Sequence, residues 1–465
     1  MTLERIGIPA VAIVTSRFVE LAETTAFKKG IPNLRITFTP HPITDRPAEL
    51  CRKYIAGSDP VTGKPMMEQI YDSLTAKLSE EDSRGGYLKR EPRPRLLPPD
   101  TPDNLLAYFH EQNFTDGNPV ILPTEKKVAE MLKGTSRAPD EWVGQMRPSP
   151  PHEAWYYTVE MVAVNAVMAG VKPEHFPLVL AMASKGVTSL ISSTSSFARM
   201  AVVNGPIVDE IGMNKGIGAL GPFSQVNSSI GRCWTLISKN LGGSGKPGET
   251  YLGTLGNPVN FNNLLMPENE EGLPPGWDPY HVQKGFRESD SVVSFLNGWS
   301  YSNIAWYSPL PQHEVIRGWL ENFFSFGTRQ AALVLDPIVA ADVAENGFKS
   351  KEAFARYLAD NTGTPAWLYW SDNPDALKRA ESGEEPYAGW LKKGMDAVVP
   401  SSRYGGRAGM AGGNADGLGN SGFTSLGENA PRVTIEIIVT GGSTNTFWGG
   451  GDFGYIGSAS IDQWR

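Results

Sequence analysis

The stretch that decides the fold is IPAVAIVTSRFVELAETTAFKKGIPNLRITFT, residues 8–39. Residues 8–14 are a short, continuous apolar run rich in β-branched side chains, which is typical of a buried strand. Ser16 can cap a helix over 17–29, and residues 34–39 predict a second strand. A strand, a helix and a strand within roughly thirty residues indicate a βαβ unit with a parallel sheet. We therefore predict an α/β protein with a small Rossmann-like or flavodoxin-like N-terminal domain.

The composition excludes several classes of protein. The chain has 465 residues, of which 40% are hydrophobic and 20% charged, so it can bury a large core and is not disordered. Its net charge of −8 argues against a nucleic-acid partner. Two cysteines, Cys51 and Cys233, make neither a disulfide framework nor a Cys-x-x-Cys site. Because the sequence contains no apolar run of about 18 residues, we expect a cytoplasmic protein that does not enter membranes.

The 50 glycines and 36 prolines gather in loops and divide the chain. We predict a βαβ domain over 1–83, a proline-rich linker over 84–103, a central α/β domain over 104–330, and a C-terminal α/β portion over 331–465 packed on it. No internal repeat is apparent. In the last three parts, periodicity predicts helices at 103–113, 125–133, 158–169, 229–240, 315–325, 330–346 and 350–359, and strands at 120–122, 198–203 and 433–440. Thr124 and Thr158 are expected to cap the second and third of these helices.

A glycine-rich stretch precedes the helix expected at 229–240. Residues 216–221 match Gly-x-Gly-x-x-Gly, but no strand ends just before them and no helix opens within them, so nucleotide binding is disfavoured. We instead predict an anion or polar-substrate site at the start of the next helix. Ser228 and Ser229 would offer hydroxyls and free amides there, and Arg232 would add positive charge.

The sequence PENEEG places three carboxylates, Glu268, Glu270 and Glu271, within four positions, and His281 follows shortly afterwards. Crowding raises carboxyl pKa values, and a nearby imidazole completes an acid–base pair. We therefore predict catalytic roles for Glu270, Glu271 and His281. The competing interpretation is a solvated acidic loop.

His41 lies between two prolines after the second strand, at the edge where parallel sheets bind ligands, and we predict that it faces the site as a catalytic group. A divalent metal is a further hypothesis, with His41, His281 and Glu268 as its candidate ligands. The full set of predicted substrate-binding residues is Asn204, Asn214, Ser228, Ser229, Arg232, Thr254 and Asn445.

Several segments resemble a bacterial family, the UGSC family of (seleno)proteins, which is named for a Sec/Cys-Gly-Ser-Cys motif near the start of its N-terminal domain. The similar stretches include GIPAVAIVTSRFVELAETTAFKKGIPNLR, DGNPVILPTEKKVAEML, VVNGPIVDEIGMNKGIGALGP and IEIIVTGG. Together they span most of the chain. The resemblance implies a Rossmann-like N-terminal domain and thiol or selenol chemistry.

The sequence departs from that family at the motif itself. No Cys-Gly-Ser-Cys occurs, Cys51 does not fall at the expected position, and Met1 stands about where the segment after the motif begins. A separate small subunit could carry the motif and dock against the first domain. Alternatively, this branch uses acid–base or metal chemistry in place of the redox residue.

These observations predict the large subunit of an oligomeric small-molecule enzyme. One hypothesis is thiol- or selenol-linked, or metal-assisted, cleavage or reduction of a carbon–heteroatom bond. A second is a hydratase, lyase or hydrolase that uses glutamate and histidine as acid and base. A third is a non-catalytic scaffold subunit. Residues 402–427 fit a lid, an intersubunit arm or a disordered loop equally well.

Overall fold

The computed structural model describes residues 8–19, 33–43, 46–77, 94–146, 155–191, 196–244, 251–304, 308–324, 330–372, 374–400 and 434–465, together with a few single positions. The segment 402–427 lies outside them. The fold belongs to the mixed α/β class predicted from the sequence. Among the described residues, none of the helices combines the length and the apolar character that crossing a membrane requires.

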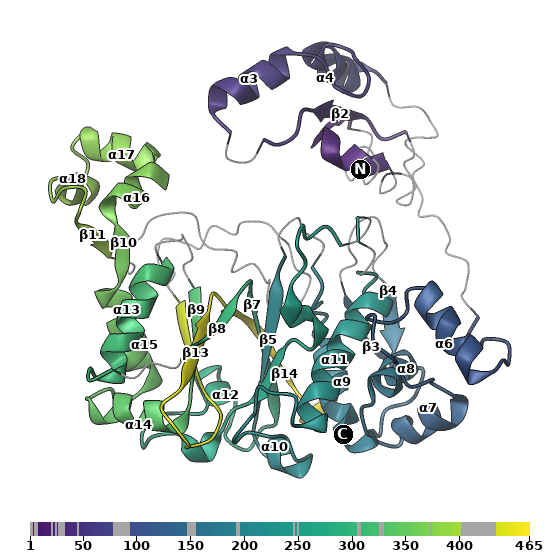
Figure 1. Ribbon diagram of the computed structural model, residues 1–465. Helices are drawn as coiled ribbons and strands as arrows, with labels where there is room; N and C mark the ends of the chain where they lie inside the picture. The colour runs from purple at the N-terminus through teal and green to yellow at the C-terminus, as the bar shows by residue number, and fades with distance from the viewer. Residues whose placement is uncertain are drawn as a thin grey trace.

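The N-terminal unit contains the expected parallel pair of strands. Strand β1 (Ala12–Thr15) pairs in parallel with β2 (Ile36–Thr39), and Val14 lies opposite Phe38. Most of the helix predicted between them lies outside the described residues, so the Rossmann-like detail stays a prediction. Helices α3 (Ala48–Ala56) and α4 (Met66–Thr75) follow and complete the unit shown in purple in Figure 1.

The rest of the chain builds a body around two four-stranded sheets (Figure 1). Sheet 1 has the order β14-β7-β5-β6, and sheet 2 has the order β8-β13-β9-β12. The strands of sheet 1 are β5 (Ala198–Asn204), β6 (Leu264–Pro267), β7 (Val292–Gly298) and β14 (Gly454–Ser460). Those of sheet 2 are β8 (Tyr301–Ile304), β9 (Gln330–Leu335), β12 (Thr434–Val439) and β13 (Trp448–Gly451).

The two sheets repeat one topology. Strand β5 pairs in parallel with β6 and antiparallel with β7, and β9 pairs in the same way with β12 and β13. The turns after β5 and β9 also share the sequence Pro-Ile-Val, at 206–208 and 337–339. The sequence shows no repeat beyond these three residues, because the repeat lies in the order and direction of the strands.

The fourth strand of each half is exchanged. Strand β8 follows β7 in the chain but pairs with β13 in sheet 2, and β14 follows β13 but pairs with β7 in sheet 1. Residues on both sides of position 330 thus contribute to both sheets, and the two halves form one body.

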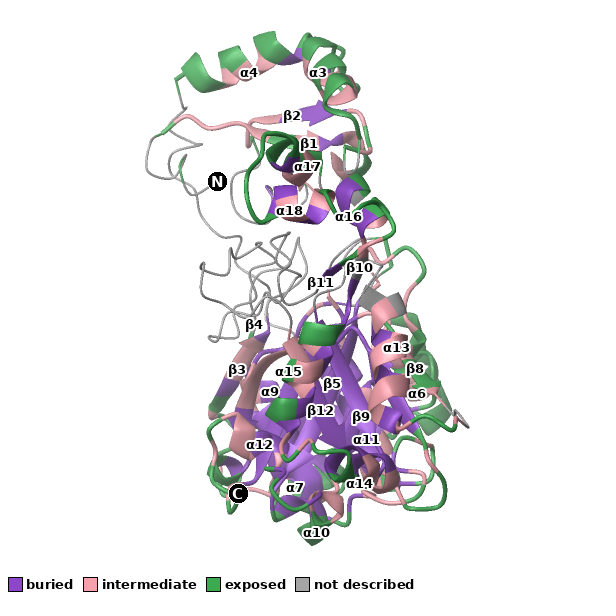
Figure 2. Cartoon of the chain, turned by 90° about the vertical axis from the view of Figure 1, so that its left-hand side faces the viewer, coloured by how far each residue is buried: buried purple, intermediate pink, exposed green. Residues whose placement is uncertain are grey.

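Helices cover the outer faces of the two sheets, which gives four layers. Alternate residues of β5 divide between two cores: Ala201 and Val203 pack toward the helices, whereas Met200 and Val202 pack toward sheet 2. The helices over sheet 1 are α8 (Val159–Ala169), α9 (Phe176–Ser184) and α11 (Gln225–Asn240). Those over sheet 2 are α13 (Gln312–Phe324), α14 (Pro337–Glu345) and α15 (Lys351–Asn361). Figure 2 shows the strands as the buried centre of the body.

Smaller elements surround these layers. Thr124 caps α7 as the sequence predicts, since its hydroxyl accepts from the amide of Lys127. Between α15 and position 400, a projecting subdomain has its own aromatic core around Tyr369 and Trp390. The remaining helices and strands are α6 (Pro102–Glu111), α7 (Glu125–Leu132), β3 (Trp142–Met146), β4 (Trp155–Thr158), α10 (Ile207–Glu210), α12 (Tyr280–Gln283), β10 (Gly363–Pro365), α16 (Ala366–Asp372), α17 (Pro374–Glu381), α18 (Tyr387–Leu391) and β11 (Val398–Pro400).

Three predicted elements need correction. Residues 330–346 are the strand β9 followed by the helix α14, because Asp336 caps a new helix through the amide of Val339. Residues 120–122 form no strand. Helix α11 begins at Gln225, four residues earlier than expected, because the hydroxyl of Ser224 accepts from the amide of Asn227.

Candidate functional site

The candidate site lies where parallel strands β5 and β6 end. Asn204 is the last residue of β5, and Glu268 follows directly after β6. Because the strands are parallel and neighbours, the two side chains meet: Nδ2 of Asn204 donates to Oε2 of Glu268 over 2.9 Å. The amide of Glu268 in turn donates to the carbonyl of Val203, which extends the ladder to the site.

Glu268 is a fully buried carboxylate with four described donors. Lys351 Nζ lies 2.7 Å from Oε1, and neither side chain is more than 2% exposed. The amides of Tyr280 and Val439 donate over 2.5 and 3.2 Å. Val439 ends β12, so this one carboxylate ties the ends of both sheets together. Because both oxygens of Glu268 already accept hydrogen bonds from the protein, we assign Glu268 the role of holding its neighbours in position.

Glu270 is the open carboxylate of the pair. Its Oε1 accepts from Nδ2 of Asn204 over 2.8 Å and from the amide of Gly205 over 2.9 Å. The side chain is 30% exposed, and none of its described hydrogen bonds engages Oε2. Glu270 is therefore anchored at one oxygen and accessible at the other.

Gly205 can hold that position only as glycine. Its φ is +84°, and a Cβ there would lie 2.2 Å from the carbonyl oxygen of Asp290. The close approach of Asp290 fixes the position of the Gly205 amide, which donates to Glu270.

His281 lies behind Glu270 in α12. Its ring is completely buried, and Nδ1 is 3.6 Å from Oε1 of Glu270, just beyond hydrogen-bonding distance. Neither ring nitrogen has a hydrogen-bond partner among the described residues. Hydrogen bonds from Arg287 lower the pKa of the Asp290 carboxyl, which lies in the loop after α12. A buried imidazole without hydrogen bonds is rare in a purely structural role.

Neighbouring side chains make this end of the body dense in ionisable groups. Tyr280 donates to Glu436 over 2.9 Å, and burial followed by this carboxylate raises the pKa of the phenol well above 10. Asp336, after β9, accepts from the amides of Val339 and Phe447, but burial outweighs these bonds and raises its carboxyl pKa.

The structure thus gathers Asn204, Glu268, Glu270 and His281, but it separates the other predicted residues from them. Glu271 points outward with 79% of its side chain exposed and pairs with Lys215 over 3.3 Å. The described contacts of His41 lie within the N-terminal unit, where Nδ1 is 3.0 Å from the hydroxyl of Thr15 and the ring packs edge-on against Phe18.

The predicted anion site at the helix start is not formed as expected. Ser228 and Ser229 lie inside α11, where the amide of Ser228 donates to the carbonyl of Ser224. Asn214 braces the glycine-rich loop: its Oδ1 accepts from Gly216 and its Nδ2 donates to Ile217.

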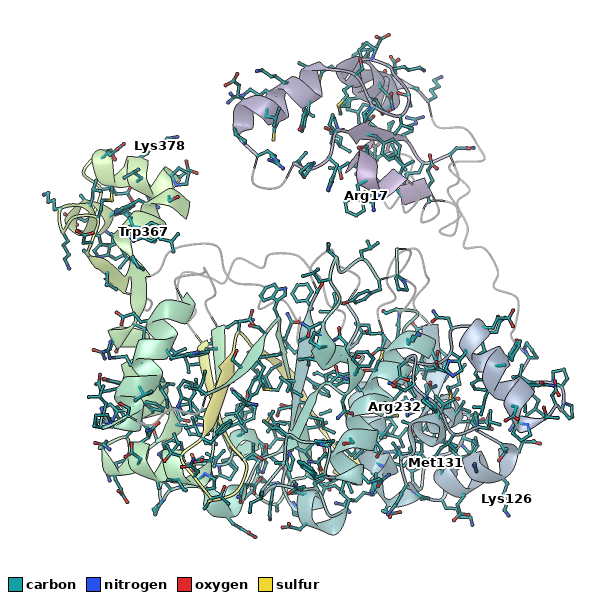
Figure 3. All side chains as sticks on the ribbon, in the orientation of Figure 1. Arg17, Lys126, Met131, Arg232, Trp367 and Lys378 are labelled. Atoms are coloured by element: carbon teal, nitrogen blue, oxygen red, sulfur yellow. The ribbon has the colours of Figure 1, made fainter. Side chains whose placement is uncertain are left out.

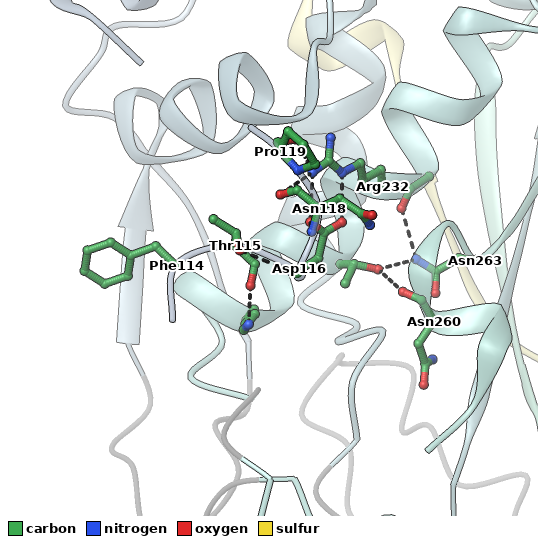
Figure 4. A network of polar contacts seen from close by, with 12 residues as sticks. Phe114, Thr115, Asp116, Asn118, Pro119, Arg232, Asn260 and Asn263 are labelled. Atoms are coloured by element: carbon green, nitrogen blue, oxygen red, sulfur yellow. Dashed lines mark hydrogen bonds and ion pairs between the residues drawn. The ribbon is translucent and has the colours of Figure 1, made fainter. Parts of the chain in front are cut away.

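Arg232 is engaged in a bidentate ion pair with Asp116, both bonds being 2.8 Å long, and also donates to the carbonyl of Pro119 (Figure 4). Figure 3 shows it on α11 within the body. Burial opposes ionisation of Asp116, but the hydrogen-bonded guanidinium prevails and lowers the pKa of that carboxyl. The positive charge expected for a substrate is therefore already neutralised.

The two remaining candidates lie in exposed loops at opposite ends of the sheets. Asn445 is in the loop between β12 and β13, where its Oδ1 accepts from the amide of Thr446. Thr254 precedes a loop that Asn257 holds to the carbonyl of Trp299, near the start of β5.

The metal hypothesis receives no support from the geometry. Across the described ranges, no three His, Cys, Asp or Glu side chains gather as metal ligands would. The three candidates His41, His281 and Glu268 are not brought together, and Lys351 occupies an oxygen of Glu268.

Sequence reasoning missed Lys351 and Tyr280. Lys351 opens α15, more than eighty positions from Glu268, and a lysine at a helix start normally lies in solvent. No local signal predicts its burial, since the pairing depends on how the two sheets meet.

Comparison with known proteins bears on the N-terminal region. The sequence model of the UGSC family matches residues 1–60. No curated protein and no solved structure matches the chain significantly. The match supports the resemblance noted in the sequence for residues 1–60, which are similar to the UGSC family.

Proposed function

We propose that this chain is the large subunit of a small-molecule enzyme and that Glu270 is its acid–base group. The observation that carries the proposal is the position of Glu270, which is anchored at Oε1, 30% exposed, and 3.6 Å from the buried ring of His281. Proton transfer by a positioned carboxylate accelerates reactions by about 10²–10⁴-fold. Hydration, elimination and hydrolysis are the reaction classes that such a pair serves.

The two oxygens of Glu270 take different parts. Asn204 and Gly205 donate to Oε1 and fix its position, and Oε2 is left to exchange a proton with a substrate or water. A shift of about 0.5 Å would let Nδ1 of His281 donate to Oε1 as well. His281 would then respond to the charge of Glu270 during the reaction.

Glu268 and Lys351 keep this geometry rigid. The ion pair holds Glu268 in place, and Glu268 accepts from the side-chain amide of Asn204. The same amide donates to Glu270 and so orients it. A site held by buried, mutually satisfied groups needs little reorganisation when charge develops.

The match to the UGSC family favours a second candidate function. In this alternative, a small subunit carrying Cys/Sec-Gly-Ser-Cys would dock on the N-terminal unit, and the complex would cleave or reduce a carbon–heteroatom bond. The thiolate or selenolate would attack the carbon and form a C–S or C–Se bond, while an acid in the complex would protonate the leaving heteroatom. The second cysteine of the motif would then attack the bound sulfur or selenium, release the protonated carbon, and leave a disulfide or selenenyl sulfide for an external thiol to reduce. His41, after the parallel strand β2, is the candidate acid from this unit.

The test uses the full chain, alone and co-purified with the products of neighbouring genes. Each preparation is incubated with a pool of small amides, esters, hydroxy acids and thioethers, and turnover is followed by NMR. We expect Glu270→Gln to lower turnover by about 10²-fold or more, with an unchanged Tm. Glu271→Gln, the exposed neighbour, serves as the matched control and should retain full activity. Equal turnover by Glu270→Gln and the parent chain would refute the assignment.

Dependence on the partner separates the two functions. Turnover by the chain alone supports the acid–base enzyme. Turnover only in the complex, with consumption of a thiol reductant and loss on His41→Gln, supports the redox alternative.

A further inference from the structure

Arg199 is a buried cation that lacks a carboxylate partner. It is the second residue of β5 and only 8% exposed. Its Nε donates to the carbonyl of Thr188 over 2.9 Å, and no other hydrogen bond or ion pair joins it to the described part of the chain. Burial alone lowers the pKa of this guanidinium to about 9. The terminal nitrogens of Arg199 are not among the fully buried atoms without partners, so this largely desolvated cation can still be reached by an anion.

The contrast with Arg232 shows that the same body pairs a comparable arginine completely. The guanidinium of Arg232 makes two bonds to Asp116 and others to backbone carbonyls. Arg199 presents the same planar fork, yet its two terminal nitrogens have no described partner. A fork of this kind matches the two oxygens of a carboxylate.

Polar atoms without partners surround Arg199 on the same face of sheet 1. Arg199 lies opposite Asn297 on β7, and the pairing of Met200 with Leu264 places Asn263 beside it on the other side. Both asparagines have a buried Oδ1 that lacks a hydrogen-bond partner. Such unsatisfied atoms are uncommon in folded proteins, and because both are acceptors, what they lack is a hydrogen-bond donor such as a hydroxyl.

Ser189 adds a hydroxyl to this group. It follows Thr188, whose carbonyl holds Arg199, and it is completely buried. Its amide donates to Ser238, but its own Oγ has no partner. The terminal nitrogens of Arg199, the Oδ1 atoms of Asn263 and Asn297, and the hydroxyl of Ser189 thus lack described partners in one region between sheet 1 and its helices.

We propose that Arg199 binds the carboxylate of a small organic acid in a site completed by Asn297, Asn263 and Ser189. A monoanion neutralises the single positive charge, whereas a phosphate dianion would leave excess negative charge in a buried region. The hydroxyl of Ser189 and the amide of Asn297 can donate to the bound acid. The free Oδ1 of Asn263 can accept from a hydroxyl next to its carboxylate, which favours 2-hydroxy acids.

This site is separate from the one at Glu270. Arg199 and Asn204 are five residues apart on β5, which corresponds to about 16 Å, and they point to opposite faces of the sheet. The site therefore does not depend on the proposed function, and either assignment can fail without the other.

The experiment measures Tm and binding of the full chain with acetate, lactate, succinate and inorganic phosphate at constant ionic strength. At a concentration about 100 times the Kd, lactate or acetate should raise the Tm by roughly 5 °C and succinate or phosphate by less. Arg199→Met should abolish this shift. Because Met removes an unpaired charge and retains an apolar stem, the ligand-free Tm of this variant should equal or exceed that of the parent.

Arg232→Met is the matched control, and it should lower the ligand-free Tm while keeping the ligand-induced shift. Arg199→Lys keeps the charge without the fork and should bind at least about 10-fold more weakly. The proposal is overturned if no carboxylate shifts the parent Tm, if phosphate shifts it as much as lactate does, or if Arg199→Met and Arg199→Lys bind as tightly as the parent.

Discussion

Lys351 Nζ lies 2.7 Å from Oε1 of Glu268, and the two side chains are 2% and 0% exposed. The pair connects the start of α15, over sheet 2, with the end of β6 in sheet 1. Glu268 also accepts hydrogen bonds from the amides of Tyr280 and Val439, so a single carboxylate links the ends of the two sheets.

Breaking this pair from one side should be costly. Lys351→Met leaves the Glu268 carboxylate buried without its counterion, and we expect a loss of about 3–5 kcal/mol of unfolding free energy, measured by urea denaturation. The double variant Lys351→Met, Glu268→Gln removes both charges and should recover part of that loss. An equal or larger loss in the double variant would show that the charge is not the cause.

His281 should be important for turnover and unimportant for stability. Because neither ring nitrogen has a hydrogen-bond partner, His281→Leu forfeits no hydrogen bond and should change the unfolding free energy by less than about 1.5 kcal/mol. Turnover should fall by about 10²-fold. His175 is the control: it is also buried, but Nδ1 accepts from the amide of Lys172, so His175→Leu should destabilise the fold more. The reverse order of stabilities would make His281 a structural residue.

Gly205→Ala should disrupt the site through the backbone. A Cβ at this position would lie 2.2 Å from the carbonyl oxygen of Asp290, and the alanine backbone would have to keep a left-handed conformation. Gly212 also has a positive φ, of +66°, but no atom lies within 4 Å of its Cβ position. Gly212→Ala should therefore cost only about 1 kcal/mol, and Gly205→Ala several times more, by urea denaturation. Similar losses of unfolding free energy in the two variants would contradict the tight packing of Gly205 against Asp290.

Acid stability should depend on Arg232. The lowered pKa of Asp116 means that ionisation of this group stabilises the fold above its unfolded pKa, near 4, and that the stabilisation is lost as the pH falls through the folded pKa. In Arg232→Gln, the guanidinium no longer offsets the effect of burial, and the pKa of Asp116 rises. The stability difference between parent and variant should thus reach about 3 kcal/mol at pH 7 and shrink toward pH 3. A difference that does not vary with pH would exclude this linkage.

The sequence predicted the α/β class, the parallel β1–β2 pair and several helices with their caps, such as α7 with Thr124 and α8 with Thr158. It failed on β9 because a fully buried strand is continuously apolar and cannot be distinguished from a buried helix by periodicity. Asp336-Pro337, a cap followed by a first-turn proline, was the local signal for the boundary.

The candidate site was predictable where its members are close in sequence. Glu268, Glu270 and His281 lie within fourteen positions and do come together with Asn204. Arg232 and Lys351 were not predictable, because whether a cation meets a carboxylate or a substrate depends on contacts with Asp116 and Glu268 across the fold.

The exchange of β8 and β14 has a consequence for how this body can be assembled. Either half alone would have a three-stranded sheet with an open edge at β7 or β13, together with a detached fourth strand that fits such an edge. A second copy of the same half could pair with both the open edge and the detached strand, as in a domain-swapped dimer. The two halves therefore complete each other's sheets within one polypeptide, and they differ at the ends of their matching strands: Glu268 follows β6 where Thr440 follows β12.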